Sequence, residues 1–474
     1  MHKHLLATAA TALLLSGCSL MPTYERPAAP VPATYGASAA DSASAPASAP
    51  QTLAPPAWKD YFTDPRLQQL IALALDNNRD LRMATLAIEQ ARAQWQIQRS
   101  AQWPQIGLGA NAARAPNSSG NLSNTYSVGG ILSAWELDFF GRLGSLKEQA
   151  LAQYLSSEEG RNAAQTSLIA AVASAWLALQ ADEEGLDISR RTLATREESL
   201  ALMKLRLDVG TASELDYRQV QSLTEAARVT LAQQQRQRAL NENALALLLG
   251  QPLPPELRAS LPGSRLVEVP SMAALPAGLP SDLLAHRPDI RQAELQLKAA
   301  NANIGAARAA FFPRISLTAQ AGTASSELSG LFKSGTWAFS PTLSALLPIF
   351  DAGRNQAGLQ AAQAGRDMAV AQYEKSIQSA FREVSDALAS QGTLDEQLRA
   401  SQAQLQAEQA RLRLAQLRYD NGVASYLDLL DAQRSLFSLE QAVVQVRLQQ
   451  LQNQVQLYKA LGGGWPAPEA QALL

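Results

Sequence analysis

The amino-acid sequence predicts a mainly α-helical chain in which two internal repeats each contribute two strands to a transmembrane β-barrel. The first observation is a duplication: Asp80-Leu81-Arg82 recurs as Asp289-Ile290-Arg291, and Pro104-Gln105-Ile106 recurs as Pro313-Arg314-Ile315, both at a shift of 209 residues. The second is a heptad pattern in two very long segments, and the third is a set of segments that alternate apolar and polar residues. Together they predict a helix–strand–strand–helix–helix unit that occurs twice.

Composition excludes several classes of function. The chain carries 40 basic and 42 acidic residues, so no nucleic-acid partner is expected. One cysteine and three histidines allow no internal disulfide and argue against thiol or metal catalysis. His2 and His4 fall in a leader, and His286 precedes a helix start, where a solvated or capping role is expected. Because no phosphate-binding glycine loop, metal cluster or nucleophile arrangement is found, we expect no enzyme, no cofactor and no metal site.

Residues 1–17 have the pattern of an export signal, with a basic start followed by an apolar run from Leu5 to Leu15. The run is shorter than the ~20 residues of a transmembrane helix. It ends in Leu15-Ser16-Gly17-Cys18, which resembles the lipobox of bacterial lipoproteins, where the signal is cut before the cysteine and that residue is lipidated. Ser19 stands where Asp usually signals retention in the inner membrane. The alternative is an ordinary signal peptide with a chance cysteine.

Residues 18–60 are expected to form a lipid-anchored tether. From about Pro27 to Pro56 the sequence is rich in Ala, Pro and Ser and has almost no large apolar residues. Such a segment cannot bury enough surface to fold alone.

Repeat 1 is expected over 61–260 and repeat 2 over 261–465, with a C-terminal tail over 466–474. In repeat 1 we expect a helix over 79–103, strands over 105–114 and 126–139, a long helix over 142–207 and a helix over 213–249. The corresponding elements of repeat 2 are a helix over 287–312, strands over 314–322 and 337–347, and helices over 354–419 and 425–461.

The long helices carry apolar residues at intervals of seven, which predicts side-by-side packing of a coiled-coil kind. In repeat 1 these residues are Val172, Leu179, Leu186, Leu193, Leu200 and Leu207. In repeat 2 they are Val370, Ile377, Val384, Leu398, Leu405, Leu412 and Tyr419, with Gln391 interrupting the series. At 1.5 Å per residue each long helix spans roughly 100 Å. The two shorter helices of a repeat add up to about the same length, so they are expected to run end to end beside the long one.

The strands of repeat 2 alternate cleanly, with Ile315, Leu317 and Ala319 on one face. Aromatic residues cluster near the strand ends, as in the interfacial girdles of membrane barrels, with ordinary core aromatics as the alternative. No apolar stretch outside the leader is expected to be long enough for a transmembrane helix, so a membrane segment must be a closed β-barrel. Four strands are too few for one barrel, because the usual minimum is about eight. The chain is therefore expected to oligomerise and to pool its strands.

Further motifs lie at the helix breaks, where Gly210, Ser213 and Asp216 recur at a shift of 212 as Gly422, Ser425 and Asp428. With Cys18, the duplicated halves and the ending Leu461-Gly462-Gly463-Gly464-Trp465, these motifs resemble the TolC-like outer membrane factor family, in particular its OprM/NodT-type lipoproteins, over 18–465. The resemblance implies a homotrimer with one 12-stranded barrel and a long periplasmic α-helical barrel. It further implies a passive duct in the outer membrane for drugs and other small toxic compounds, with a periplasmic adaptor and an inner-membrane RND transporter as partners.

The helix breaks have a structural and a functional interpretation. Gly210 and Gly422 suit helix ends, and Ser213 and Ser425 suit N-caps completed by Asp216 and Asp428. The resemblance implies that Asp428 and Asp431 form a ring of carboxylates at the pore constriction. It also places Asp216, Arg418 and Tyr419 among residues that hold this end closed. TolC itself carries Arg where this chain has Ala424, so that contact does not transfer.

The two turns are also the expected docking surface for the adaptor. This surface comprises Val209, Gly210, Thr211, Ala212, Ser213, Gly422, Val423, Ala424 and Ser425. Two other functions stay open: an exit channel for a type I protein secretion system and a metal-ion efflux channel. A periplasm-spanning structural lipoprotein without a pore is a third hypothesis, and the amphipathic strands over 314–322 and 337–347 argue against it.

Overall fold

The computed structural model describes residues 19–32, 35, 56–116, 118, 120–270, 272 and 287–463. The leader over 1–17, Cys18, most of the tether, His286 and the tail over 466–474 lie outside the described residues. The chain divides into two compact units: unit 1 comprises residues up to 29, 85–160 and 289–376, and unit 2 comprises 30–84, 161–288 and the residues from 377 onward. Each unit takes residues from both repeats, so the division in space does not follow the duplication in the sequence.

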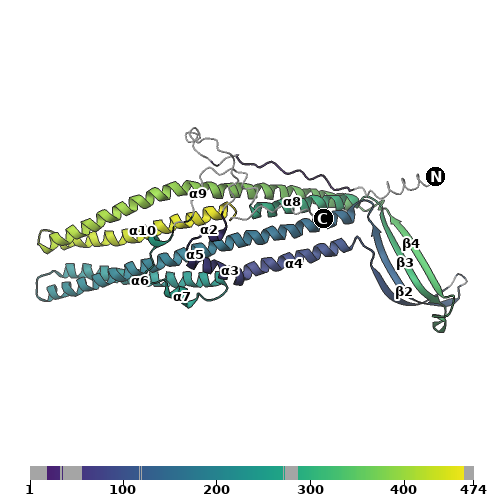
Figure 1. Cartoon of the computed structure of the whole chain (residues 1–474), viewed down its shortest axis with the longest axis horizontal. Helices are drawn as coiled ribbons and strands as arrows, with labels where there is room; N and C mark the ends of the chain where they lie inside the picture. Colours follow the sequence, from purple (N-terminus) through teal and green to yellow (C-terminus); the bar gives the residue numbers. More distant parts are fainter. Residues whose placement is uncertain are drawn as a thin grey trace. The chain divides into compact units, whose positions relative to one another are not determined.

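Unit 1 contains a four-stranded sheet in the order β1-β2-β3-β4, antiparallel throughout (Figure 1). Its strands are β1 (Ile106–Pro116), β2 (Leu122–Leu137), β3 (Arg314–Ser325) and β4 (Trp337–Leu346). The central pair, β2 and β3, joins the two repeats. A register shift between Leu132 and Trp135, where Ala134 has a positive φ of 43°, marks a bulge that bends β2.

The sheet exposes apolar side chains and leaves both edges unpaired within the described chain. Leu108 on β1 is 93% exposed and Trp337 on β4 is 70% exposed. β1 pairs only with β2 and β4 only with β3, so the outer edge of each carries free backbone groups. Such edges can pair with the strands of another copy of the chain, and such apolar faces can be covered by lipid.

Two helices of 67 residues each run through both units: α5 (Arg142–Asp208) and α9 (Arg354–Asp420). The sequence placed them over 142–207 and 354–419. The helices α4 (Arg79–Ser100) and α8 (Pro288–Ala309) precede the strand pairs. In unit 2, α6 (Glu214–Leu249) follows α5 and α10 (Tyr426–Ala460) follows α9, each forming a helical hairpin.

Several short elements were not anticipated from the sequence. They are α2 (Trp58–Tyr61), α3 (Pro65–Asn77), α7 (Pro255–Ala259) and the 3₁₀ turns η2 (Leu266–Glu268) and η4 (Leu328–Gly330). The start of α3 has a clear local cause, because the Asp64 side chain accepts a hydrogen bond from the Arg66 amide and Pro65 occupies the first turn.

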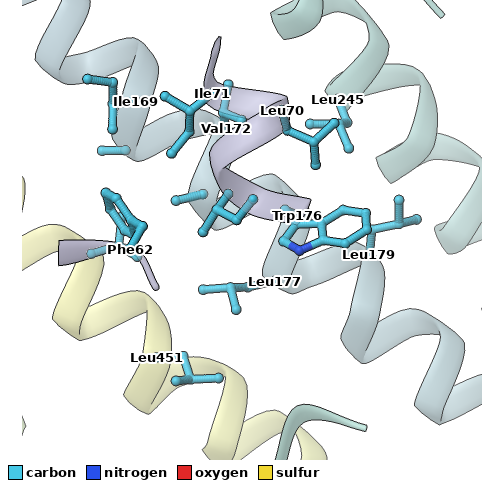
Figure 2. Close-up of a cluster of buried hydrophobic side chains, with 14 of the residues drawn as sticks. Phe62, Leu70, Ile71, Ile169, Val172, Trp176, Leu177, Leu179, Leu245 and Leu451 are labelled. Carbon is cyan, nitrogen blue, oxygen red and sulfur yellow. The ribbon is translucent and has the colours of Figure 1, made fainter. Parts of the chain in front are cut away.

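The helix α3 is buried because it completes the core of unit 2. Leu70 and Ile71 of α3 meet Val172, Trp176 and Leu179 of α5 (Figure 2). Trp176 is 1% exposed, and Leu245 of α6 and Leu451 of α10 belong to the same cluster. Val172 and Leu179 are heptad positions, so the periodicity in the sequence marks the buried side of α5 in this region.

One expectation about membrane helices was wrong. The helix α5 contains an 18-residue stretch with a mean hydropathy of 1.2, apolar enough to cross a membrane by length and composition. Half of that stretch is buried inside the protein, as is usual for a core helix. The argument for a barrel therefore rests on the sheet and not on the lack of an apolar helix.

Candidate functional site

The candidate site is the pair of turns that join the helices of each hairpin in unit 2. Gly210 and Gly422 have φ values of 74° and 71°, in the left-handed region, where a residue with a side chain would be strained. The space around both is open, because a Cβ added to either would meet nothing within 4 Å. The Thr211 amide donates to the Arg206 carbonyl at 2.8 Å, and the Val423 amide donates to the Arg418 carbonyl at 2.9 Å. Both helices therefore end in the same left-handed glycine turn.

Both following helices start with a complete capping box. The Ser213 side chain accepts from the Asp216 amide and the Asp216 carboxylate accepts from Ser213, and Ser425 and Asp428 repeat the arrangement. The structural interpretation of these four residues is thereby confirmed. Because the capping hydrogen bond holds it, the Asp428 carboxylate is turned toward the helix start.

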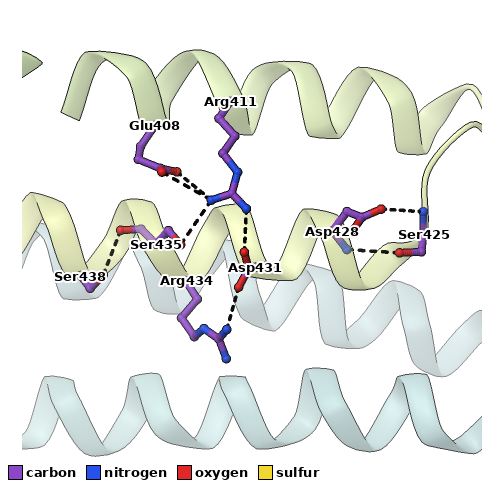
Figure 3. A network of polar contacts seen from close by, with 8 residues as sticks. All are labelled: Glu408, Arg411, Ser425, Asp428, Asp431, Arg434, Ser435 and Ser438. Carbon is purple, nitrogen blue, oxygen red and sulfur yellow. Dashed lines mark hydrogen bonds and ion pairs between the residues drawn. The ribbon is translucent and has the colours of Figure 1, made fainter. Parts of the chain in front are cut away.

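Asp431, one turn further along α10, has different partners (Figure 3). Its carboxylate accepts from Arg411 of α9 at 2.6 Å and from Arg434 of α10 at 2.7 Å. Arg411 also contacts Glu408. The hydrogen bond from Arg411, together with that from Arg434, holds the pKa of Asp431 below its ordinary value. Asp428 and Asp431 are thus not equivalent, since only Asp431 is neutralised by two guanidinium groups.

A second contact ties the two hairpins together. Arg206 of α5 donates to the Tyr419 hydroxyl of α9, and its guanidinium lies 5.6 Å from the ring centroid. Tyr419 packs on Tyr426 of α10 with ring centroids 5.1 Å apart. Tyr419 therefore makes a contact between the hairpins, as a residue that holds this end closed should. Its arginine partner is Arg206 of the other repeat. The predicted residue Arg418 is exposed.

Sequence reasoning missed Arg206, Arg411, Arg434 and Tyr426 as members of this site. The spacing of Arg434 three residues after Asp431 was a usable signal, because residues i and i+3 are neighbours on a helix. Arg411 lies on another helix, and the sequence contains no local sign of that contact.

The turns also present matched apolar side chains to solvent. Leu202, Leu205 and Leu215 of the first hairpin are exposed by 50–67%, and their counterparts Leu414, Leu417 and Leu427 by 57–61%. The members of each pair are separated by 212 residues, the shift of the duplication. Val209 and Val423 are 64% and 66% exposed. A group of exposed apolar side chains at matching positions is a candidate interaction site.

The chain matches the family model described as outer membrane efflux protein twice, over residues 70–251 and 279–463. The toluene efflux pump outer membrane protein TtgF of Pseudomonas putida is 49% identical, with 100% of this chain and 99% of TtgF covered. The antibiotic efflux pump outer membrane protein ArpC of the same species is 47% identical, with 100% and 98% covered. The open state of the MtrE outer membrane channel of Neisseria gonorrhoeae superposes with a TM-score of 0.82 at 41% identity, covering 94% of this chain and 98% of that structure.

Proposed function

The chain belongs to the outer membrane efflux protein family, and we propose that it acts as the passive exit duct of a tripartite RND-type pump. The observation that carries this proposal is the extent of the likeness, which spans both repeats, the sheet and both hairpin turns. Its curated relatives are outer membrane proteins of efflux pumps, and its location is the outer membrane. A duct of this family performs no chemistry, so transport needs neither a catalytic group nor a cofactor in this chain.

Three copies are proposed to form the channel. Each contributes four strands, and the free edges of β1 and β4 pair with neighbouring copies to close one 12-stranded barrel. The outward face then carries Leu108 and Trp337 toward lipid. The helices of the three copies form the periplasmic α-helical barrel.

The substrates are proposed to be small apolar organic compounds, including solvents and antibiotics. This rests on the two relatives, one named for toluene efflux and the other for antibiotic efflux, which cover the whole chain at nearly the same identity. A duct that accepts both has to discriminate weakly, so selection belongs to the inner-membrane transporter.

The exposed turns are proposed to dock the periplasmic adaptor. Six matching turns in a trimer, each presenting leucine and valine side chains, suit the apolar positions of helical hairpins on a partner. The adaptor in turn connects the duct to the RND transporter.

The closed state is proposed to depend on two contacts of the site. One is the Arg411–Asp431–Arg434 cluster, and the other is the Arg206–Tyr419 contact between the hairpins. Both lie near the turns, where a change in the spacing of the helices would alter the width of the duct. We also propose that Cys18 carries the lipid anchor, which rests on the lipobox alone.

The test is deletion of the gene and complementation in the native host. We expect the deletion to increase susceptibility to several unrelated apolar drugs and to raise dye accumulation, and the wild-type gene to restore both. The empty vector and a gene with an early stop codon are the controls. If susceptibility stays unchanged while a secreted protein disappears from the medium, the efflux proposal is wrong and protein secretion takes its place.

A further inference from the structure

The first described residues of the chain form a strap that lies on one face of α8 within unit 1. This strap, Ser19–Arg26, runs antiparallel to the helix. The contacts, in order along α8, are Glu294 with Arg26 and Tyr24, Lys298 with the Tyr24 ring, Asn301 with the Pro22 carbonyl, Gly305 with Met21, and Arg308 with the Leu20 carbonyl.

The five α8 positions follow one another at intervals of three or four, so they form a single stripe on the helix. Two of them, Asn301 and Arg308, donate to strap carbonyls at 2.8 Å and 3.2 Å. Gly305 has no side chain, and a Cβ placed there would lie 2.9 Å from the Met21 Cα and 2.4 Å from the Ser145 Oγ. The stripe is therefore shaped for a chain segment that passes directly over the helix backbone.

Glu294 fastens the far end of the strap. Its buried carboxylate accepts from the Arg26 Nη2 at 2.6 Å, the Arg26 Nε at 3.1 Å and the Tyr24 hydroxyl at 3.1 Å. Burial opposes ionisation of Glu294, but the hydrogen bonds from Arg26 and the charge of Lys298 outweigh it and hold the pKa of the carboxyl below its ordinary value. A charged, doubly bound clamp of this kind resists release of the strap.

The counterpart helix of repeat 1 lacks the stripe. At the shift of 209 residues, the positions of Glu294, Lys298, Asn301, Gly305 and Arg308 correspond in α4 to Thr85, Glu89, Arg92, Gln96 and Arg99. Four of the five differ, and a glutamine replaces the glycine over which the strap passes. Two helices of common origin have thus diverged at the positions that touch the strap, which points to a role for the contact in one repeat only.

We propose that this stripe of α8 is a docking track that sets where the lipid anchor leaves the protein. The proposal rests on the lipidation of Cys18 proposed above. Ser19, one residue after Cys18, lines a hollow with Asp138, Gly141 and Gly144, at the junction of β2 and α5. Consecutive Cα atoms lie about 3.8 Å apart, so a docked Ser19 fixes the point from which the chain leads back to its lipidated residue. Phe139 beside it is 40% exposed, as expected where side chains meet a membrane interface.

The track therefore holds Ser19 at the end of the sheet where β2 leads into α5. A strap that undocked would no longer hold the start of the chain at this junction.

The test uses full-length trimer from cells labelled with tritiated palmitate and a glutamyl endopeptidase. Glu25 is exposed in the docked strap and is the only glutamate before Glu89. Cleavage after it removes residues 18–25 with their lipid, so loss of label from the chain measures strap release. We expect Gly305→Gln and Glu294→Ala to be cut about tenfold faster than wild type, because cleavage follows the undocked population and charged hydrogen bonds are lost.

Gly358→Gln is the matched control, since Gly358 also lies within a helix of unit 1 and a Cβ there meets nothing within 4 Å. It should be cut at the wild-type rate, and native gels should show trimers for every variant. If wild type is cut as fast as Gly305→Gln, the docking track is wrong. If wild type takes up no label, Cys18 carries no lipid and the role proposed for the strap is wrong. Docking itself can still be measured in that case, because cleavage after Glu25 lowers the mass of the chain.

Discussion

Arg411 of α9 and Asp431 of α10 are joined by an ion pair of 2.6 Å, and Arg434 occupies the other oxygen of the same carboxylate at 2.7 Å (Figure 3). This relationship changes the expected nature of the constriction. A ring of three Asp431 side chains would bring six guanidinium groups with it, so it would not act as a bare ring of negative charge. The pair instead holds α9 and α10 together near the turn.

The first prediction concerns this pair. Arg411→Leu removes the ion pair between the two helices, so we expect a wider duct. Because an exposed ion pair contributes little free energy, we expect ion conductance in planar bilayers to increase only about two- to fivefold. Arg399→Leu is the control, since Arg399 is on the same helix and pairs with Glu396 one turn away, so its loss breaks no link between helices among the described residues. Equal conductance of both variants would show that the pair does not hold the duct.

The second prediction concerns pH. The hydrogen bonds from Arg411 and Arg434 lower the pKa of Asp431, so their contribution is present above the ordinary aspartate pKa and is lost only as pH falls through the lowered value. We therefore expect wild-type conductance to stay constant between pH 7 and about pH 5. An increase in conductance within that pH range would show that a titratable group other than Asp431 controls the opening of the duct.

The third prediction concerns a buried acid in the core of unit 2. Burial raises the pKa of Asp182 to about 6, against the hydrogen bond that Asn241 donates, with Glu183 and Arg238 nearby. The folded state then holds a proton that the unfolded state releases, so stability decreases as pH rises from about 4 to about 6. Asp182→Asn should remove this dependence and gain about 1 kcal/mol at pH 7.5 but little at pH 4. Thermal unfolding at the two pH values measures this gain in stability. Asp187→Asn, on the exposed side of α5, is the control.

A similar gain for Asp182→Asn at both pH values would contradict the assignment, because a proton-linked effect must fade where the acid is already protonated.

The fourth prediction concerns the turns. Gly210→Trp and Gly422→Trp place a bulky side chain on the proposed docking surface, and we expect both to abolish crosslinking to the adaptor and efflux. Gly263→Trp is the matched control, since Gly263 has a φ of 80° and nothing within 4 Å of an added Cβ, but lies away from the turns. The control carries the same backbone strain. If all three variants fail alike, strain and not docking explains the loss.

Much of the helical architecture follows from local patterns. Heptads at Val172 and Leu179 report the buried side of α5 directly, and the Ser-x-x-Asp caps report the start of α6 and α10. Local signals suffice because helices and their caps are built from neighbours in the sequence.

Contacts between distant segments were not predictable in the same way. Arg206 and Tyr419 are 213 residues apart, and Arg26 and Glu294 are 268 residues apart. The helix α3 was not predicted, although its cap at Asp64 is local, and it is held by core contacts with α5 that no local pattern reports. In each case tertiary packing, and not periodicity, decides the partner.

The central claim is that the chain is the exit duct of an efflux pump. Its most direct test is the rate at which cells preloaded with a fluorescent apolar dye lose it on re-energisation. We expect rapid loss with the wild-type gene in a deletion strain, loss as slow as with empty vector for Gly422→Trp, and the wild-type rate for Gly263→Trp. Equal dye loss with and without the gene would contradict the account.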